Sequence, residues 1–275
     1  MKKANGQQLS LFDITLEHNT QNIVTESPTV SEPMKTERPI VSGNNFCPYP
    51  IPKVDEIIKM IDRSAYKVNR SQLISDVFEC GALAISNMVD FTKYDEREKR
   101  YLDIMNGYSP DERKLLVDIF SKIFALSSSV VYDNGKFGDY LGELFMRCNQ
   151  GNKFAGQFFT PYHISYLMAR CAITDDSIKQ NEIMTICDPC CGGGGMAMAA
   201  LDVLKNDYKV NYAMDCFIEC ADIDIRCVHM TYLQLALAGV PAIVKHQNTL
   251  TQELYSVWKT PAYIFQYHRF YKYGV

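Results

Sequence analysis

The sequence predicts an α/β fold with a parallel sheet, preceded by a helical domain. Three observations predict it. From about residue 156 onwards, short apolar runs alternate with helical patterns, which is typical of parallel strands joined by right-handed crossovers. From Pro52 to Cys148 the apolar residues recur at helical spacing instead. A run of four glycines, Gly192 to Gly195, follows one of the apolar runs, where a ligand-binding turn is expected.

The 275 residues divide into three expected segments. Residues 1–45 are rich in Thr, Ser, Asn, Glu and Pro and lack periodicity. Such a segment buries too little apolar area to offset its ordering entropy, so we expect a disordered arm. Residues 46–150 form the expected helical domain, and residues 151–275 form the expected α/β domain.

Composition limits the class of protein. A net charge of -4 and a pI of about 5.8 argue against a surface coated in positive charge for indiscriminate nucleic-acid binding. The first residues are polar, and no apolar stretch is long enough to cross a membrane. Most of the ten cysteines lie in apolar surroundings, as free buried thiols do. We therefore expect a reduced, cytoplasmic protein without membrane spans.

A metal site is the alternative interpretation of the cysteines. Its ligands would be Cys187, Cys190 and Cys191, joined by Cys216 and Cys220. Paired two-cysteine knuckles are missing, however, and a ligand turn explains the glycines after Cys191 better. We therefore expect no metal.

The helical domain carries recognisable faces and caps. Val54, Ile57, Ile58 and Ile61 have core-face spacing. Ser109 is the expected N-cap of a further helix, with Pro110 at its first position. A short helix is expected over residues 139–145.

The α/β domain is predicted element by element. Helices are expected over residues 161–172, 196–205 and 224–237, and strands over residues 183–187, 213–220 and 242–246, with a weaker strand over 255–259. Residues 263–273 mix aromatic with basic residues and are interpreted as a half-buried edge strand. The alternative for this stretch is a surface that stacks bases and pairs phosphates.

The glycine run has the chemistry of a ligand-binding turn. Glycines let the backbone pass close to a bound molecule, and the N-terminus of the following helix suits a carboxylate or phosphate. Neither the dinucleotide pattern nor the phosphate-loop ending is matched. Asp188, directly before the turn, favours a ligand with an amino group. A methionine-like head with both amine and carboxylate fits these demands.

Polar residues also follow the next two strands. Asp222 is expected to accept hydrogen bonds from two ribose hydroxyls, as acids do after the second strand of nucleotide-binding folds. Asp224 is expected to cap the next helix. Asn248, after the third strand, is placed to meet the edge of an adenine ring.

The glycine run with Asp188, Asp222 and Asn248 follow three successive strands. In this order they resemble the N6-adenine DNA methyltransferases related to the modification subunits of type I restriction systems. Residues 156–161 (Gly-Gln-Phe-Phe-Thr-Pro) and 139–145 are also similar to family segments, and the resemblance spans about residues 139–250. It implies a Rossmann-like fold, S-adenosylmethionine as cofactor, DNA as substrate, and a specificity or second methylase subunit as partner. Position by position, it assigns the following residues to the cofactor: Phe159, Thr160, Pro161, Asp188, Cys190, Gly192, Gly194, Asp222 and Asn248.

The family's catalytic motif is Asn/Asp-Pro-Pro-Tyr/Phe, whose first side chain accepts from the target amine while the aromatic ring stacks on the flipped base. This sequence has Thr260-Pro261-Ala262-Tyr263 instead, so Thr260, Pro261 and Tyr263 are the catalytic candidates. A hydroxyl replaces the carbonyl acceptor there. Because the sequence stops at Val275, we expect the sheet to be truncated after the region of the fourth strand.

Two functions follow from the resemblance. One is an S-adenosylmethionine-dependent DNA adenine-N6 methyltransferase of restriction-modification type, completed by a partner. The other is a catalytically impaired methyltransferase-like protein that binds DNA or cofactor without transferring methyl.

The expected arm holds one short apolar motif. Gln8, Leu9, Leu11 and Phe12 resemble the peptide by which bacterial replication and repair proteins dock on the DNA polymerase sliding clamp. Three apolar side chains in a flexible arm suit a shallow apolar cleft. The alternative is a short amphipathic segment that folds back on its own domain.

Overall fold

The computed structural model of the chain describes residues 52–64, 69–132, 137–148, 159–178 and 182–271. All of these residues belong to one compact unit. The helical segment and the α/β segment, which the sequence analysis expects as two domains, are therefore packed together. The expected arm, with its motif from Gln8 to Phe12, lies outside the described residues.

The helical segment comes first along the chain. Its elements are α2 (Pro52–Ser64), α3 (Arg70–Asn87), η1 (Phe91–Lys93), α4 (Tyr94–Asn106), α5 (Pro110–Tyr132) and α6 (Tyr140–Cys148). The predicted apolar stripe of α2 is buried, as the side chains of Val54, Ile57, Ile58 and Ile61 show. The predicted start of α5 is also confirmed: Pro110 is its first residue, and the backbone N–H of Ser109 donates to Glu112 at 2.8 Å.

The α/β segment follows. Its elements are α7 (Tyr162–Ala172), η2 (Asp175–Ser177), β1 (Met184–Asp188), α8 (Gly195–Asn206), α9 (Tyr212–Asp215), β2 (Cys216–Asp222), α10 (Ile225–Leu237), β3 (Ala242–Asn248), β4 (Glu253–Lys259), α11 (Pro261–Phe265) and α12 (Tyr267–Phe270). The alternation of strands and helices confirms the predicted α/β class. β2 begins later than predicted, because the residues just before Cys216 form the short helix α9.

The four strands lie in the order β1-β2-β3-β4. β1, β2 and β3 are parallel, with Asp188 level with Cys220 and Asp222 level with His246. We call the edge at which these three strands end the carboxyl edge of the sheet. β4 runs antiparallel to β3, so its last residue, Lys259, lies level with Ile243 near the start of β3. β4 therefore ends at the opposite edge, which we call the amino edge.

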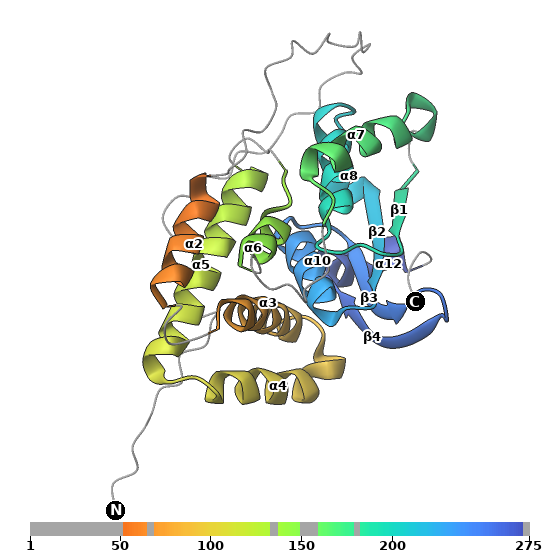
Figure 1. Cartoon of the computed structure of the whole chain (residues 1–275). Coiled ribbons are helices and arrows are strands. Elements are labelled where there is room, and N and C mark those ends of the chain that lie inside the picture. Colours follow the sequence, from red (N-terminus) through yellow and green to blue (C-terminus); the bar gives the residue numbers. More distant parts are fainter. Residues whose placement is uncertain (1–51, 65–68, 133–136, 149–158, 179–181, 272–275) are drawn as a thin grey trace, which may run out of the picture. The chain divides into compact units, whose positions relative to one another are not determined.

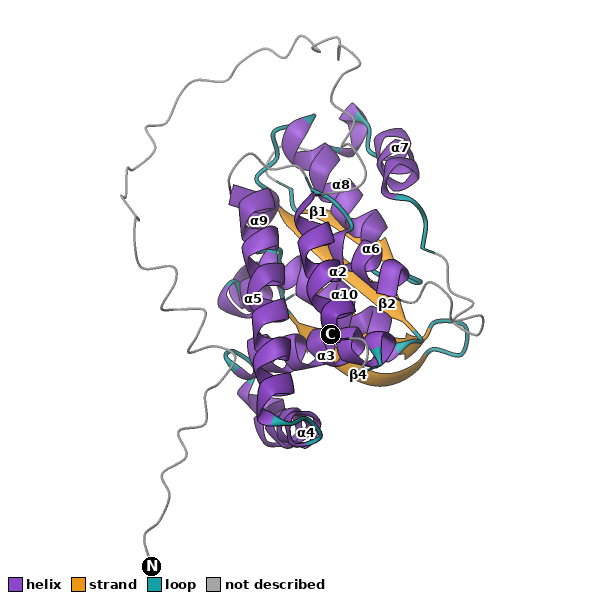
Figure 2. Cartoon of the chain, turned by 60° about the vertical axis from the view of Figure 1, so that its left-hand side comes forward, coloured by secondary structure: helices purple, strands orange, loops and turns teal. Residues whose placement is uncertain are grey.

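Helices cover one face of the sheet in two layers (Figures 1 and 2). α10 packs directly on β2 and β3, and α3 packs on α10 from outside. Arg97 of α4 ties this helical segment to the sheet: it donates to Asp90 at 2.9 Å and to the backbone oxygen of Val257 in β4 at 3.0 Å. Its guanidinium also lies 4.5 Å from the ring centroid of Trp258. This buried cation adds a polar link to the packing of α3 on α10 and of α10 on the sheet.

The short helices α11 and α12 cover part of the other face. Phe217 of β2 and Ile243 of β3 form a buried cluster with Tyr263 and Phe270 of these helices. The predicted edge strand over residues 263–273 is therefore wrong over its described part. Pro261 at the first helical position and a capping threonine before it start a helix instead.

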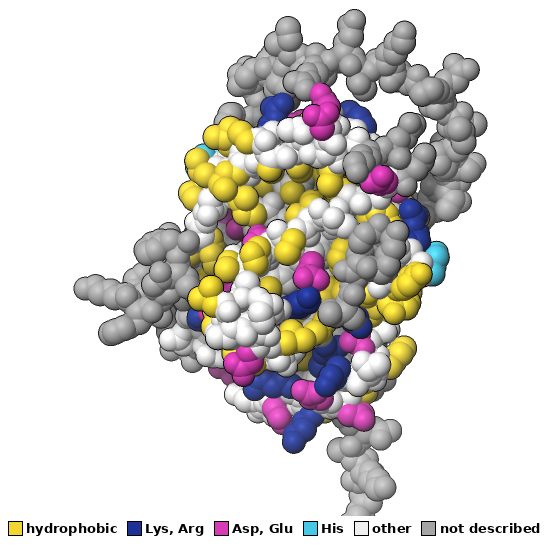
Figure 3. All heavy atoms as spheres, turned by 90° about the vertical axis from the view of Figure 1, so that its right-hand side faces the viewer, with side chains coloured by type: hydrophobic (Ala, Val, Ile, Leu, Met, Phe, Trp, Pro, Cys, Tyr) yellow, Lys and Arg dark blue, Asp and Glu magenta, His cyan; other side chains and the backbone are white. Residues whose placement is uncertain are grey.

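The exposed surface has two characters. On the face in Figure 3, hydrophobic side chains are spread over the upper and middle parts, whereas Lys and Arg mix with Asp and Glu at the lower end. Ile164, Leu167 and Met168 of α7 are exposed apolar residues. Among the helices of the described ranges, none has the length and apolar character needed to cross a membrane. Cys187 and Cys190 are exposed while Cys191 is buried, and no group of three metal-ligating side chains occurs among the described residues.

Candidate functional site

The glycine turn joins β1 to α8 at the carboxyl edge. Gly192 has a φ of +54° and Gly194 a φ of +90°, a left-handed region that other residues enter with strain. A Cβ on Gly194 would lie 3.0 Å from the hydroxyl oxygen of Thr231, and the Gly194 N–H donates to the Cys191 carbonyl at 2.9 Å. This backbone path therefore needs glycine for both its angles and its close approach to α10.

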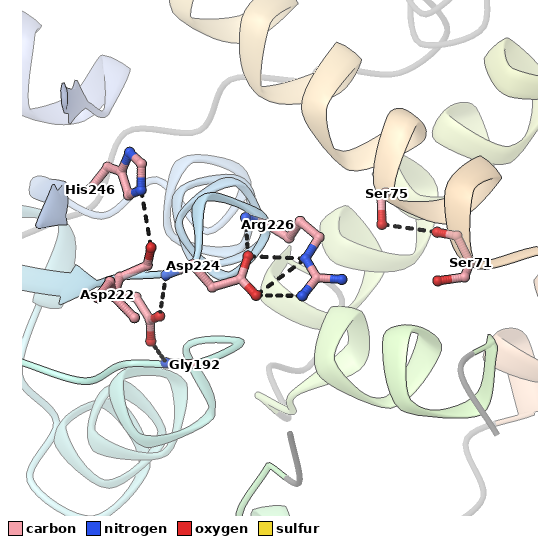
Figure 4. A network of polar contacts seen from close by, with 8 residues as sticks. Ser71, Ser75, Gly192, Asp222, Asp224, Arg226 and His246 are labelled. Carbon is pink, nitrogen blue, oxygen red and sulfur yellow. Dashed lines mark hydrogen bonds and ion pairs between the residues drawn. The ribbon is translucent and has the colours of Figure 1, made fainter. Parts of the chain in front are cut away.

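Asp222, the last residue of β2, holds this turn from the neighbouring strand (Figure 4). One carboxylate oxygen accepts from the backbone N–H of Gly192 at 2.8 Å, and the other accepts from the N–H of Asp224 at 2.8 Å. A carboxylate has about four lone-pair sites, so each oxygen keeps capacity for a hydroxyl donor. Asp224 caps α10 by accepting from the N–H of Arg226 at 2.9 Å, which confirms its predicted role.

Asp188 ends β1 beside this turn. Burial raises the pKa of its carboxyl above the ordinary value, and the nearby negative charge of Asp222 raises the pKa further. The N–H of Cys190 opposes the shift by donating to Asp188 at 3.2 Å. A bound ammonium group would relieve the repulsion between these two neighbouring carboxylates.

Phe159 lies against the turn from the segment before α7. Cβ atoms built on Gly192 and Gly193 would lie 3.1 and 3.4 Å from its ring. The ring also stacks on Phe145 of α6, with 5.7 Å between centroids. Thr160 and Pro161 follow it and are exposed, and Pro161 is the N-cap of α7. The structure thus brings Phe159 together with the glycines.

The residues that follow β3 contact the segment that follows β1. The hydroxyl of Thr249 donates to the Pro189 carbonyl at 2.6 Å, across the carboxyl edge. Asn248 does not offer the free amide oxygen that its predicted role requires. That oxygen already accepts from the N–H groups of Leu250 and Thr251 at 3.1 and 3.2 Å. Asn248 therefore closes the β3–β4 turn, and Thr249 is a contact that the sequence analysis missed.

Ile223 is a second missed residue. Its side chain is 60% exposed although it stands between the two ordered acids Asp222 and Asp224. The ring of His246 contacts the Ile223 carbonyl at 3.1 Å, which fixes the backbone there. A large apolar side chain held in the open beside a carboxylate can cover one face of a ring. In the sequence, the signal that could have indicated Ile223 was its position directly after Asp222.

The predicted catalytic residues are not brought to this site. Thr260, Pro261 and Tyr263 follow β4 and therefore lie at the amino edge of the sheet, away from the glycine turn. The Thr260 hydroxyl donates to the Val240 carbonyl at 2.6 Å and accepts from the N–H of Ala242 at 2.9 Å.

Burial points the same way. Thr260 and Tyr263 are both 0% exposed, and the Tyr263 ring packs on Phe217 with 5.8 Å between centroids. A ring in that core is not available to stack on a flipped base. Their placement therefore does not support a catalytic role and gives Thr260 a structural one, as the cap of α11.

Comparison with known proteins gives one family. Residues 133–267 match the family model described as N-6 DNA Methylase. This range contains the glycine turn, Asp188, Asp222 and Asn248. No curated protein matches the sequence.

Three solved structures are similar. The methyltransferase subunit of a type I restriction-modification system from Streptococcus thermophilus shares 16% identity with a TM-score of 0.42, over 72% of this chain and 58% of that chain. A candidate class I S-adenosylmethionine-dependent methyltransferase from Listeria monocytogenes shares 18% with a TM-score of 0.40, over 72% and 54%. The modification subunit of a candidate type I restriction enzyme from Vibrio vulnificus shares 14% with a TM-score of 0.41, over 72% and 56%. This chain therefore spans between half and two thirds of the length of each.

Proposed function

We propose that this chain, whose residues 133–267 match the family model described as N-6 DNA Methylase, belongs to that family, binds S-adenosylmethionine at the glycine turn and serves methylation of adenine N6 in DNA. The observation that carries the proposal is the bridge from Asp222 to Gly192, at 2.8 Å, across the carboxyl edge. A turn held open by glycines and flanked by two carboxylates is a binding site for a small ligand that offers both an amine and hydroxyl groups.

The residues of the site fit the parts of this cofactor. Asp188 would pair with the ammonium of the methionine end, because its carboxyl is partly desolvated and lies near a second negative charge. Asp222 would accept from the ribose hydroxyls. Ile223 would lie against the adenine ring, and Phe159 would cover the methionine end above the glycines. When bound, the cofactor supplies an electrophilic methyl group on a sulfonium.

The chain's own residues contribute binding and orientation to such a reaction. The turn would fix the position of the methyl donor, and Phe159 would exclude water from one side of it. The acceptor for the adenine amine has to come from elsewhere, because Thr260 is buried at the other edge of the sheet. We propose that a partner, either a second methylase subunit or another copy of the chain, supplies that acceptor and the contacts to DNA.

The burial of Thr260 also supports a second candidate function. A methyltransferase-like protein that holds the cofactor or DNA without transferring methyl would have no need for an acceptor at Thr260. The motif Gln8 to Phe12 stays a separate proposal of docking to a polymerase sliding clamp. A pull-down with purified clamp, in which Leu11→Ala and Phe12→Ala abolish capture, would support it, whereas unchanged capture would contradict it.

Incubation with methyl-labelled S-adenosylmethionine and mixed-sequence DNA separates the two candidates. The chain alone is compared with the chain plus purified methylase and specificity subunits of a type I restriction-modification system. Label in N6-methyladenine, lost in Asp222→Ala, supports the transferase. Binding of the cofactor or of DNA without label transfer in either mixture supports the second candidate, and binding of neither contradicts both.

A further inference from the structure

A buried carboxylate lies directly behind the glycine turn, although it belongs to the helical segment. Asp139 precedes α6 and is 4% exposed. One of its oxygens accepts from the N–H of Gly142 at 3.0 Å and from the side-chain amide of Gln234 at 2.8 Å. Among the residues that the structure describes, its donors are uncharged, and burial raises the pKa of this carboxyl. Burying a carboxylate without a cation is costly, so the position calls for an explanation.

Gln234 carries the contact forward to the turn. Its side-chain nitrogen, on α10, donates one hydrogen to Asp139 and the other to the Gly193 carbonyl at 2.5 Å. Gln234 is itself 4% exposed, so both of its amide hydrogens are donated to acceptors inside the protein. The Asp139 oxygen and the Gly193 carbonyl each accept one of these hydrogens, so together they set which way the amide points.

The carboxylate also contacts the start of α8. A Cβ on Gly195, the first residue of that helix, would lie 2.9 Å from one oxygen of Asp139, and a Cβ on Gly193 would lie 3.4 Å from the other. A negative charge is favoured at a helix N-terminus, where the backbone dipoles leave partial positive charge. Small residues in the turn thus let the Asp139 carboxylate approach from the side of the helical segment.

α10 holds the neighbouring carbonyl in the same way. The Thr231 hydroxyl donates to the Gly192 carbonyl at 2.9 Å, one turn of helix before Gln234. Two successive carbonyls of the glycine turn therefore accept from α10, while the N–H of Gly192 donates to Asp222 on the other side. The backbone of the turn is fixed from two directions.

We propose that Asp139 and Gln234 are the positioning residues of the cofactor turn, holding Gly193 in the conformation that binds S-adenosylmethionine. This inference rests on the proposed function for its ligand. It also makes the helical segment part of the binding site, since Asp139 comes from that segment.

The chain offers a matched control pair. Asp76 of α3 is 7% exposed and accepts from the side-chain amide of Gln72 at 2.7 Å, the same pair of residue types away from the turn. Gln234→Leu and Asp139→Leu are compared with Gln72→Leu and Asp76→Leu in the full chain. Asp139→Asn is the conservative variant, because its carboxamide oxygen can accept the same two hydrogen bonds.

Two readouts are needed: the Kd for S-adenosylmethionine from calorimetry, and hydrogen exchange at the Gly194 amide, which donates to the Cys191 carbonyl at 2.9 Å. We expect Gln234→Leu and Asp139→Leu to raise the Kd and speed Gly194 exchange by tenfold or more each. Asp139→Asn should stay within about threefold of the parent in both. The Gln72 and Asp76 variants should lower stability and leave both readouts unchanged.

Folded Gln234→Leu protein with parental Kd and parental Gly194 exchange would overturn the proposal, and so would equal effects from the Gln72 pair. Should Asp139→Leu not fold, Gln234→Leu and Asp139→Asn carry the test. If the parent chain does not bind S-adenosylmethionine, the proposed function fails. Gly194 exchange in the ligand-free protein then still decides whether Asp139 and Gln234 position the turn.

Discussion

The carboxylate of Asp222 accepts the backbone N–H of Gly192 at 2.8 Å, which joins the end of β2 to the turn after β1. The two residues are far apart in sequence, and the parallel register of the strands brings them to one edge of the sheet.

Gly194→Ala is expected to weaken cofactor binding. Its φ of +90° strains any side chain, and the new Cβ would lie 3.0 Å from the Thr231 hydroxyl oxygen. Gly239→Ala is the matched control, since Gly239 has a φ of +70° at the end of α10 and is outside the turn. Both variants should lose stability, by about 1–2 kcal/mol from the left-handed backbone. Only Gly194→Ala should raise the Kd for S-adenosylmethionine tenfold or more, and similar Kd values for the two variants would contradict the assignment.

Asp188→Asn is expected to separate stability from binding. Because burial and Asp222 raise the pKa of Asp188, the folded protein binds that proton more tightly than the unfolded chain does. The ionised group therefore costs stability, and this cost grows as the pH rises from the ordinary pKa of Asp through the raised value. At pH 7 the variant should be at least as stable as the parent in urea denaturation. Its affinity for S-adenosylmethionine should fall, because an amide does not pair with an ammonium. A variant that binds normally would remove Asp188 from the site.

Thr260→Val is expected to destabilise the protein and leave cofactor affinity unchanged. The substitution removes a buried hydroxyl that donates to Val240 and accepts from Ala242. Leaving these groups unpaired costs about 1–3 kcal/mol. Thr260→Ser keeps the hydroxyl and should restore most of the stability. Loss of methyl transfer in Thr260→Val at unchanged stability would instead revive a catalytic role.

Stability should fall in mild acid because of His229. This side chain is 4% exposed and lies 4.8 Å from Trp258, centroid to centroid. Burial lowers its pKa to about 4, so the unfolded chain binds the proton first. Stability is complete above the ordinary pKa of histidine and is lost as the pH falls towards 4, by about 3 kcal/mol in total from this group. His229→Leu should flatten that part of the urea-denaturation profile; an unchanged slope would show that other groups cause it.

The sequence predicts much of the fold because its signals are local. The apolar runs of β1 and β3, the glycine turn and the capping acid Asp224 each depend on a few neighbouring residues, and the structure has them. The position of Thr260 could not be predicted in the same way. It depends on β4 pairing antiparallel with β3, a non-local choice that sends the end of β4 to the amino edge.

Two parts of the site were also beyond sequence reasoning. Asn248 looks like a free acceptor until the turn closes on its amide oxygen. Asp139 meets Gly193 only because α6, α10 and the glycine turn converge, and no periodicity in the chain indicates that convergence. Side chains that join distant segments are therefore the ones that the structure adds.

Calorimetric titration of the full chain with S-adenosylmethionine tests the central claim most directly. Asp222→Ala removes the bridge to Gly192. The control is Asp215→Ala, which removes an ion pair between α9 and Arg269 of α12. We predict one site per chain with a micromolar Kd, lost in Asp222→Ala and retained in Asp215→Ala. No binding heat for the parent together with no shift of its melting temperature, or equal binding by both variants, would contradict the account.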